Sequence, residues 1–258
     1  MKSLRGLGAL LTAPGRFRDE FVRSGDDVTA VTVIRLSVLP FTIWALGFSV
    51  SQVIAVATYN NENFLGIGSV GAMIFMLLLA GASIAAIPLF TKGARWCFRF
   101  VAWFLGLLLA LWGRPTSQTE KAVLFRATAY CGGLLNIAAC IPTIGLTVMK
   151  FDRMAPNGNK LAGLNGPWSP LMQPFTPLQP MLNLIFQPQQ QLRGEIWWSW
   201  SPALLLLAFG HLVVVAFIFL LSWHLAALLK MTWWRPLATL ASACLAFGCF
   251  GIVLKWLF

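Results

Sequence analysis

The chain has 258 residues, of which 58% are hydrophobic and only 10% are charged, and its mean hydropathy is +0.76. A soluble domain carries about a quarter charged residues, so this composition excludes a water-soluble fold. The net charge of +11 would suit a nucleic-acid partner in a soluble protein, but here the basic residues lie in short links between apolar runs. We interpret them as topology signals and as contacts to anionic lipids.

Residues 1–27 combine five basic side chains with apolar residues near helical spacing. We expect a basic amphipathic segment that lies on the membrane surface and breaks at Pro14. A frayed basic tail that only fixes the orientation of the protein is the alternative. The apolar positions of the segment are Leu4, Leu7, Leu11, Phe17 and Phe21.

Residues 28–150 carry apolar runs that are long enough for a first helical bundle of about four spans. The expected spans are residues 28–59, 70–90, 98–112 and 121–149. A short basic link separates the second span from the third. Its basic residues are Lys92, Arg95 and Arg99. The polar run from Thr116 to Glu120 supplies a helix start for the fourth span.

The fourth span contains several residues that affect its shape and packing. Gly132, Gly133 and Pro142 predict a bent or broken helix rather than a straight one. Asn136 is the most polar residue of its interior. For this side chain we favour a hydrogen bond to a neighbouring helix over a role in binding.

Residues 151–201 change in character, with seven prolines, many Asn and Gln residues and few charges. Proline at this frequency prevents a continuous helix and favours an extended conformation. The loop is nevertheless too apolar for a solvated linker, so we expect it to lie on the membrane surface or against a protein partner. Its candidate docking positions are Trp168, Phe175 and Phe186.

Residues 202–258 predict a C-terminal helical hairpin, with spans at 202–229 and 236–257. The predicted fold class is therefore all-α, a polytopic membrane protein of about six spans, or of five spans with a re-entrant third segment. With six spans, the links on the N-terminal side hold most of the Lys and Arg residues. The positive-inside rule then places both termini on the cytoplasmic side, and we expect a bacterial inner membrane. A re-entrant third segment would reverse every later link.

The sequence contains no pattern that predicts a reaction, and we expect that the protein is not an enzyme. The Asp and Glu residues lie outside or at the edges of the apolar runs, which argues against an ion-coupled pump. The five cysteines form no CxxC pair, so neither a metal site nor a disulfide framework is indicated. His211 and His224 share one span, and we favour ordinary packing or interfacial roles for them over single-His ligation of a haem or chlorophyll. No cofactor is predicted.

Three short segments resemble the Yip family of multi-span membrane proteins, the Rab-interacting proteins of eukaryotes and their bacterial relatives. The first is an Ala-Tyr pair that opens a helix ending near a proline and a glycine, here at Tyr130, Pro142 and Gly145. Residues 13–17 resemble the family's Pro-x-x-Phe entry, and residues 225–238 resemble the polar link before its last helix. The resemblance implies a helical membrane protein without catalysis. The family usually has five spans and lacks a Pro- and Gln-rich insert.

These observations lead to three hypotheses about function. The first is a Yip-like membrane protein that binds other membrane proteins or lipids, with a role in membrane organisation or trafficking. The second is an accessory subunit of a larger respiratory or photosynthetic complex, in which residues 156–191 drape over a partner. The third is a transporter or channel for a neutral or anionic solute, suggested by the broken fourth helix. The expected partners are the lipid bilayer, anionic lipids and other membrane proteins, and no nucleic acid is expected.

Overall fold

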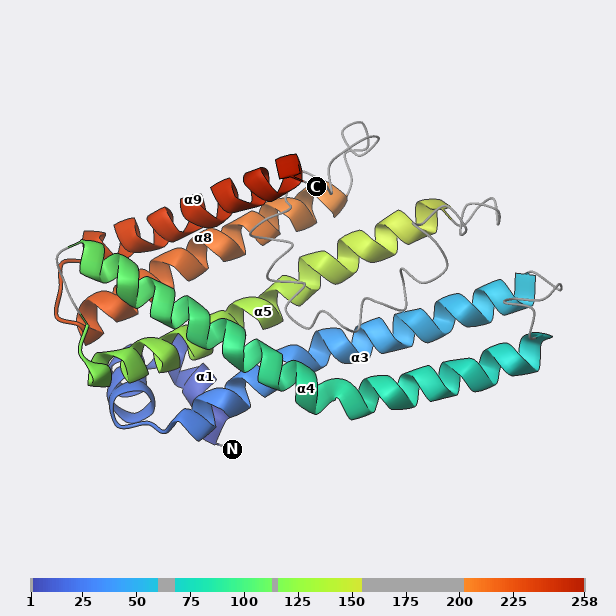
Figure 1. The fold of residues 1–258 in the computed structure, drawn as a ribbon, viewed down its shortest axis with the longest axis horizontal. Helices are drawn as coiled ribbons and strands as arrows, with labels where there is room; N and C mark the ends of the chain where they lie inside the picture. Colours follow the sequence, from blue (N-terminus) through green and yellow to red (C-terminus); the bar gives the residue numbers. More distant parts are fainter. Residues whose placement is uncertain (1, 60–67, 113–115, 155–201, 258) are drawn as a thin grey trace.

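The computed structural model describes residues 2–59, 68–112, 116–154 and 202–257, and within these ranges every regular element is a helix (Figure 1). The elements are α1 (Lys2–Thr12), α2 (Pro14–Arg16), the π-helical η1 (Phe17–Arg23), α3 (Asp27–Tyr59), α4 (Gly68–Leu111), α5 (Gln118–Met154), α8 (Pro202–Leu228) and α9 (Trp234–Leu257). The predicted all-α fold class is therefore confirmed for these residues.

Two of the long helices begin at side chains that cap their free N–H groups. The Asp26 carboxylate accepts a hydrogen bond of 2.6 Å from the Thr29 backbone N–H at the start of α3. Before α5, the Ser117 backbone N–H donates to Glu120 Oε2 at 2.8 Å, while the Glu120 N–H donates to Ser117 Oγ at 3.3 Å. This reciprocal pair is a capping box. The helix start predicted before the fourth span is thus confirmed.

Four helices of the described residues are long and apolar enough to cross a membrane, judged by length and composition. The stretches that meet this condition are Asp27–Trp44, Thr91–Leu111, Gln118–Gly145 and Ala208–Leu228. A helix of about 20 apolar residues spans the hydrocarbon core of a bilayer. These four stretches indicate an integral membrane protein.

The predicted count of six spans is not confirmed, because the expected second and third spans form one helix. Helix α4 runs without interruption from Gly68 to Leu111 and includes the expected basic link. Lys92, Arg95 and Arg99 lie three and four residues apart, so they share one face of a helix. Lys and Arg are good helix formers and supply none of the turn chemistry that a chain reversal needs. The charge in this link therefore does not mark a turn.

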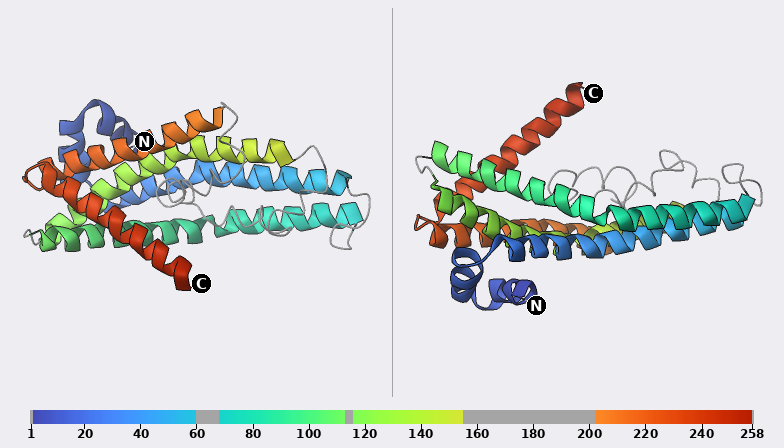
Figure 2. Two further views of the ribbon diagram at one scale, coloured as in Figure 1. Left: turned by 90° about the horizontal axis from the view of Figure 1, so that it is seen from above. Right: turned by 60° about the horizontal axis from the view of Figure 1, so that its bottom comes forward.

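Helix α5 lies at the centre of the bundle and contacts α3, α4 and α8. Helix α9 packs against α8 and α4, and Figure 2 shows it diverging from the other long helices toward its C-terminal end. The bundle is thus closest-packed around α5, and the last helix leads away from it.

Two adjacent glycines let the neighbouring helices approach α5. A Cβ atom on Gly133 would lie 2.8 Å from Val33 Cγ1 of α3, and one on Gly132 would overlap the Phe98 ring of α4. Small residues at such contacts are typical of membrane helix packing. Helix α5 continues unbroken to Met154. The helix that was expected to be bent or broken is thus not broken, and the two glycines set its distance to α3 and α4.

Asn136 makes the hydrogen bond to a neighbouring helix that the sequence predicts. Its Nδ2 donates to the Ser37 carbonyl oxygen of α3 at 2.9 Å, and the Asn136 side chain is fully buried. A helix carbonyl can accept this second bond because its oxygen has two lone pairs.

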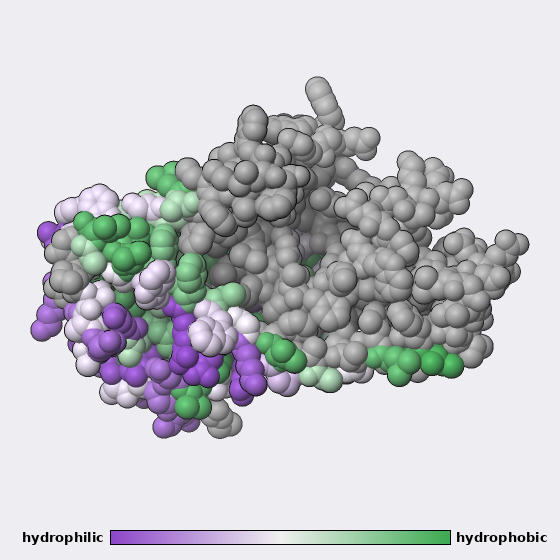
Figure 3. Space-filling model, viewed as in Figure 1, coloured by the Kyte–Doolittle hydropathy of each residue, from purple (hydrophilic) through white to green (hydrophobic). Residues whose placement is uncertain are grey.

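The prediction of six spans assigns the basic residues near the start of α5 and after α8 to the side opposite the N-terminus, and the structure corrects this assignment. Arg126, near the start of α5, donates to the Val22 carbonyl oxygen at 3.0 Å, and Arg23 donates to the Ala227 carbonyl oxygen at 3.3 Å. The start of α5 and the end of α8 therefore lie at the same end as the N-terminal helices. Hydrophilic residues gather over this end in Figure 3. The assignment was wrong because it placed a turn near residue 92, where α4 is continuous. The direction of every later span depended on that turn. The side on which each terminus lies stays a prediction.

Candidate functional site

The N-terminal segment, here defined as residues 2–23, folds back onto the bundle through Phe17. The Phe17 side chain is fully buried. Its ring lies 5.3 Å from the Tyr130 ring of α5 and 4.8 Å from the His224 ring of α8, both in edge-to-face arrangements. Such aromatic pairs contribute about 0.5–1.5 kcal/mol beyond the area that they bury. Phe17 thus joins the segment to two different helices.

Tyr130 of α5 is a residue of the bundle on which the N-terminal segment packs. Its side chain is fully buried, and its ring lies 6.2 Å from the ring of Phe21. A Cβ atom on Gly6 would come 2.5 Å from Tyr130 Cε1, so α1 passes directly over the tyrosine ring. The Tyr130 hydroxyl has no hydrogen-bond partner in the part of the chain that the structure describes. It is a buried donor without an acceptor.

His224 is packed under the segment rather than open to a cofactor. Its side chain is fully buried between Phe17 and Trp223, whose ring lies 5.2 Å from the imidazole, and the Leu10 backbone faces it. Within the described residues neither ring nitrogen makes a hydrogen bond of normal geometry. Above Trp223 the Arg18 guanidinium lies 5.2 Å from the ring centroid, a cation–π contact. A haem or chlorophyll could reach His224 only if Phe17 moved away.

Arg126 of α5 binds the C-terminal end of the N-terminal segment. Its Nε donates to Asp27 Oδ1 at 2.9 Å, and one terminal nitrogen donates to the carbonyl oxygens of Val22 at 3.0 Å and Arg23 at 3.3 Å. A single guanidinium therefore holds the end of η1 and the start of α3 against α5. Arginine suits this task because its planar fork presents several donors in fixed directions.

The face that α1 turns toward the bundle is its small-residue face. Ser3, Gly6 and Leu10 are buried, whereas Leu4 and Leu11 are each 62% exposed. Close approach of helix backbones requires small side chains at the contact. The outward leucines, together with the exposed basic residues beside them, give the segment an amphipathic outer surface.

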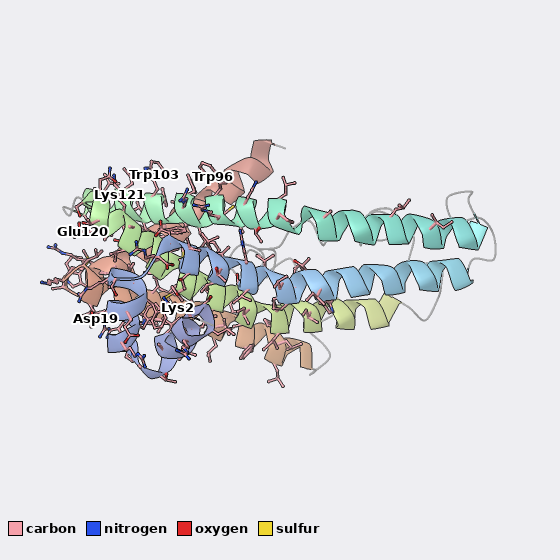
Figure 4. The ribbon with its side chains drawn as sticks, turned by 90° about the horizontal axis from the view of Figure 1, so that it is seen from below. Lys2, Asp19, Trp96, Trp103, Glu120 and Lys121 are labelled. Carbon is pink, nitrogen blue, oxygen red and sulfur yellow. The ribbon has the colours of Figure 1, made fainter. Side chains whose placement is uncertain are left out.

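Charged residues from distant parts of the chain lie at the same end of the molecule as this contact. Figure 4 shows Lys2 and Asp19 of the N-terminal segment at the same end of the molecule as Glu120 and Lys121 of α5. On the segment itself, Arg16 pairs with Glu20 and Arg23 pairs with Asp19, each at 2.9 Å. These are exposed pairs one helical turn apart and contribute little to stability.

Asp26 is the acidic residue of this region with a clear electrostatic shift. Hydrogen bonds from the side chain and backbone of Thr29 lower the pKa of the Asp26 carboxyl, and the nearby charges of Lys2 and Arg126 act in the same direction. The carboxylate form is thus favoured where it caps α3.

Two of the cavities at this end of the protein are lined by charged residues. The first, which we call the Tyr130 cavity, has a volume of about 350 Å³ and lies between the N-terminal segment, the start of α3 and Tyr130. The second has a volume of about 490 Å³ and lies between α4 and α5. Arg99 and Lys121 line the second cavity, and the Arg99 guanidinium lies 5.6 Å from the Phe125 ring centroid.

The other residues that the sequence singles out lie apart from this contact. His211 is exposed on α8. Pro142 is buried within α5, and a Cβ atom on Gly145 would lie 2.5 Å from Leu206 Cδ1 of α8. In the described part of the chain no group of His, Cys, Asp or Glu could hold a metal ion. The candidate docking positions fall outside the described residues: Trp168, Phe175 and Phe186.

Sequence reasoning missed the role of Arg126. One signal could have found it. Arg126 precedes Tyr130 by four residues, so both side chains lie on one face of α5. The acidic pair Asp26 and Asp27 at the start of the first span was an available partner.

Comparison of the chain with family models, curated proteins and solved structures found no match.

Proposed function

We propose that this chain is a non-catalytic, Yip-like integral membrane protein of a bacterial inner membrane, and that it binds other membrane proteins or lipids at the end that carries the N-terminal segment. The role that follows is membrane organisation or trafficking. The observation that carries the proposal is the contact of Phe17 with Tyr130 and His224.

Each of the three segments on which the resemblance rests contributes a residue to one cluster of buried side chains. Phe17 ends the Pro-x-x-Phe entry, and Tyr130 belongs to the Ala-Tyr pair of α5. The polar link begins at Leu225, which is buried directly after His224. Segments more than 90 residues apart in the sequence thus form one packed unit. A chance resemblance would give no reason for them to converge.

The number of long helices also supports the proposal. The family usually has five spans, and the described residues contain five long helices, α3, α4, α5, α8 and α9. The sequence suggested six because it divided α4 in two. With α4 counted as one helix, the number of long helices in the described residues equals the usual number of spans in the family, and four of these helices carry a stretch apolar enough to cross a membrane.

The proposal is tested by crosslinking the tagged full chain in its native membrane, followed by extraction in mild detergent and quantitative mass spectrometry of what is recovered. Two variants are compared with the natural chain. Phe17→Ala removes the buried anchor of the segment, whereas Leu11→Ala changes an exposed residue of the same segment. We expect recovery of partner proteins or lipids to fall in Phe17→Ala and to persist in Leu11→Ala, with equal amounts of all three proteins in the membrane.

Equal recovery with Phe17→Ala and Leu11→Ala would contradict the proposal. So would a loss of cellular function in His211→Ala when that variant inserts normally, because the proposal assigns chemistry to no single polar residue. Recovery of one large complex at fixed stoichiometry, or a visible absorption band, would instead favour the accessory-subunit hypothesis. The loop on which that hypothesis depends lies outside the described residues.

A further inference from the structure

The Tyr130 cavity combines groups that suit one kind of ligand. It is lined by charged residues of the N-terminal segment and of the start of α3, with the tyrosine as its floor. The residues that matter for the argument are Lys2, Arg5, Arg16, Glu20, Asp26 and Tyr130. Its volume of about 350 Å³ exceeds what one or two water molecules occupy.

The Tyr130 hydroxyl is the first indication of a ligand. Buried hydroxyl groups in proteins almost always have a hydrogen-bond partner, because an unmet donor costs free energy. The buried Tyr130 hydroxyl has none in the described part of the chain, and Tyr130 is one of the residues that line this polar cavity. A ligand with an acceptor oxygen would satisfy it.

The charges around the cavity indicate the sign of that ligand. Arg16 and Glu20 form an ion pair at 2.9 Å, and the Asp26 carboxylate accepts the Thr29 N–H. Lys2 and Arg5, in contrast, lie three residues apart on one face of α1 and form no ion pair within the described residues. Two basic side chains are thus available to an anionic group.

The outer surface of α1 indicates where the anion comes from. The side chains of Leu4 and Leu11 point away from the bundle and are largely exposed, and Leu4 adjoins Arg5 in the sequence. A helix with outward leucines and basic residues is typical of a segment at the membrane interface. Phosphate groups are concentrated at that interface.

We propose that the Tyr130 cavity binds the phosphate of a phospholipid headgroup. Lys2 and Arg5 pair with its negative charge, and the Tyr130 hydroxyl donates a hydrogen bond to a phosphate oxygen. The carboxylates of Glu20 and Asp26 also line the cavity, and they accept hydrogen bonds from a headgroup amine where the lipid carries one. The inference deepens the proposed function and rests on it in part, since it names the lipid chemistry and the residues that recognise it.

The test uses the purified, delipidated full chain in detergent and native mass spectrometry. Phosphatidylethanolamine, phosphatidylglycerol and inorganic phosphate are titrated separately. Arg5→Gln and Tyr130→Phe alter the cavity. Lys121→Gln removes one positive charge at the same end of the protein but from the second cavity.

We expect at least one of the two phospholipids to bind at defined stoichiometry. Tyr130→Phe should weaken it about tenfold, the usual effect of losing one hydrogen bond to a charged group. Arg5→Gln should weaken it by about threefold to tenfold, because the Arg5 side chain is exposed to solvent. Lys121→Gln should leave it unchanged.

A control for folding comes from the same variant. Tyr130→Phe removes a hydroxyl that has no partner, so without lipid its melting temperature should match that of the natural protein or exceed it. A purely structural role for Tyr130 therefore predicts no change in lipid binding for this variant.

Three results would overturn the inference. These are lipid binding that is unaffected by Arg5→Gln and Tyr130→Phe, lipid binding that is lost in Lys121→Gln instead, and inorganic phosphate that binds the delipidated protein more tightly than either phospholipid. Because the assay contains no partner protein, the headgroup site can fail while the recovery of membrane proteins from native membranes still depends on Phe17. The two proposals are therefore tested separately.

Discussion

Helices α5 and α8 pack against each other, and the more apolar of the two is the less buried. The membrane stretch of α8 has the higher mean hydropathy, yet 33% of it is buried, against 72% for the stretch of α5. In a soluble protein the most apolar helix would occupy the core. Lipid tails, however, solvate apolar side chains as well as a protein interior does, so burial in a membrane depends on close fit and polar contacts.

The residues at the centre of the molecule follow this rule. Helix α5 contributes Gly132, Gly133 and Asn136, each of which brings another helix closer or bonds to it. Helix α8 turns large apolar side chains outward. These exposed positions include Leu205, Leu212, Val215 and Phe219. The difference between the helices predicts how much each will tolerate substitution.

The largest effect is expected at the buried aromatic contact. Tyr130→Ala should lower the free energy of unfolding by about 3–5 kcal/mol, the usual cost of removing a large aromatic side chain from a packed site. Phe219→Ala removes an exposed aromatic side chain from α8 and should change it by less than about 0.5 kcal/mol. Denaturation of both variants in the same detergent measures the difference. Equal losses would show that burial in the bundle does not distinguish the two helices.

A smaller loss is expected where α5 meets α3. Gly133→Ala places a Cβ atom 2.8 Å from Val33 and should cost about 1–3 kcal/mol through overpacking. Among the described residues a Cβ atom on Gly81 of α4 meets nothing within 4 Å, so the higher helix propensity of Gly81→Ala should leave stability unchanged or raise it. Melting temperatures of the two variants measure the contrast, and a stable Gly133→Ala would argue against the close α3–α5 contact.

The clamp formed by the bonds of Arg126 to Asp27, Val22 and Arg23 should contribute less to the free energy of unfolding than the aromatic contact. Arg126→Gln loses the ion pair to Asp27 and weakens the bonds to Val22 and Arg23. We expect a loss of about 1–2 kcal/mol, below the full value for charged hydrogen bonds because Asp27 is partly exposed. Amide hydrogen exchange should rise in residues 17–27. Lys121→Gln is the control, and similar exchange in both variants would contradict the clamp.

The smallest expected effect is the pH dependence of the Asp26 cap. Because Thr29 lowers the Asp26 pKa in the folded protein, the charged cap stabilises α3 at pH values above the usual 3.8 of an unfolded aspartate. This contribution is lost as the pH falls through the lower folded-state pKa. Asp26→Asn keeps a capping oxygen but does not titrate. The melting temperature of the natural protein should therefore fall toward that of Asp26→Asn in acid, and a constant difference between them would contradict the assignment.

The sequence was sufficient for the features that depend on local composition. Runs of apolar residues predicted the helical membrane fold, the Ser117 and Glu120 pair marks the start of α5, and the hydrogen bond of Asn136 follows from its position within an apolar span. The first two depend on residues close together in the chain, and the third depends on the cost of leaving an amide unpaired in an apolar span.

The features that sequence reasoning missed depend on contacts between distant segments. The leucine pattern of residues 4–11 did not indicate that α1 packs on the bundle through Gly6, where a Cβ atom would lie 2.5 Å from Tyr130 Cε1. The charges near residue 92 suggested a turn, and this error reversed the assignment of later links. No local pattern showed that Phe17 would meet Tyr130, which is 113 residues away.

The docking of the N-terminal segment on α5 and α8 is the central claim, and photo-crosslinking tests it most directly. A benzophenone amino acid is placed at Phe21, which is partly buried beside Tyr130, or at Leu11, which faces outward. After illumination in native membranes, the probe at residue 21 should attach to peptides of α5 from the same chain, while the probe at residue 11 attaches to lipid or other molecules. Attachment of both probes to lipid alone would contradict the claim, because the segment would then lie on the membrane without contacting the bundle.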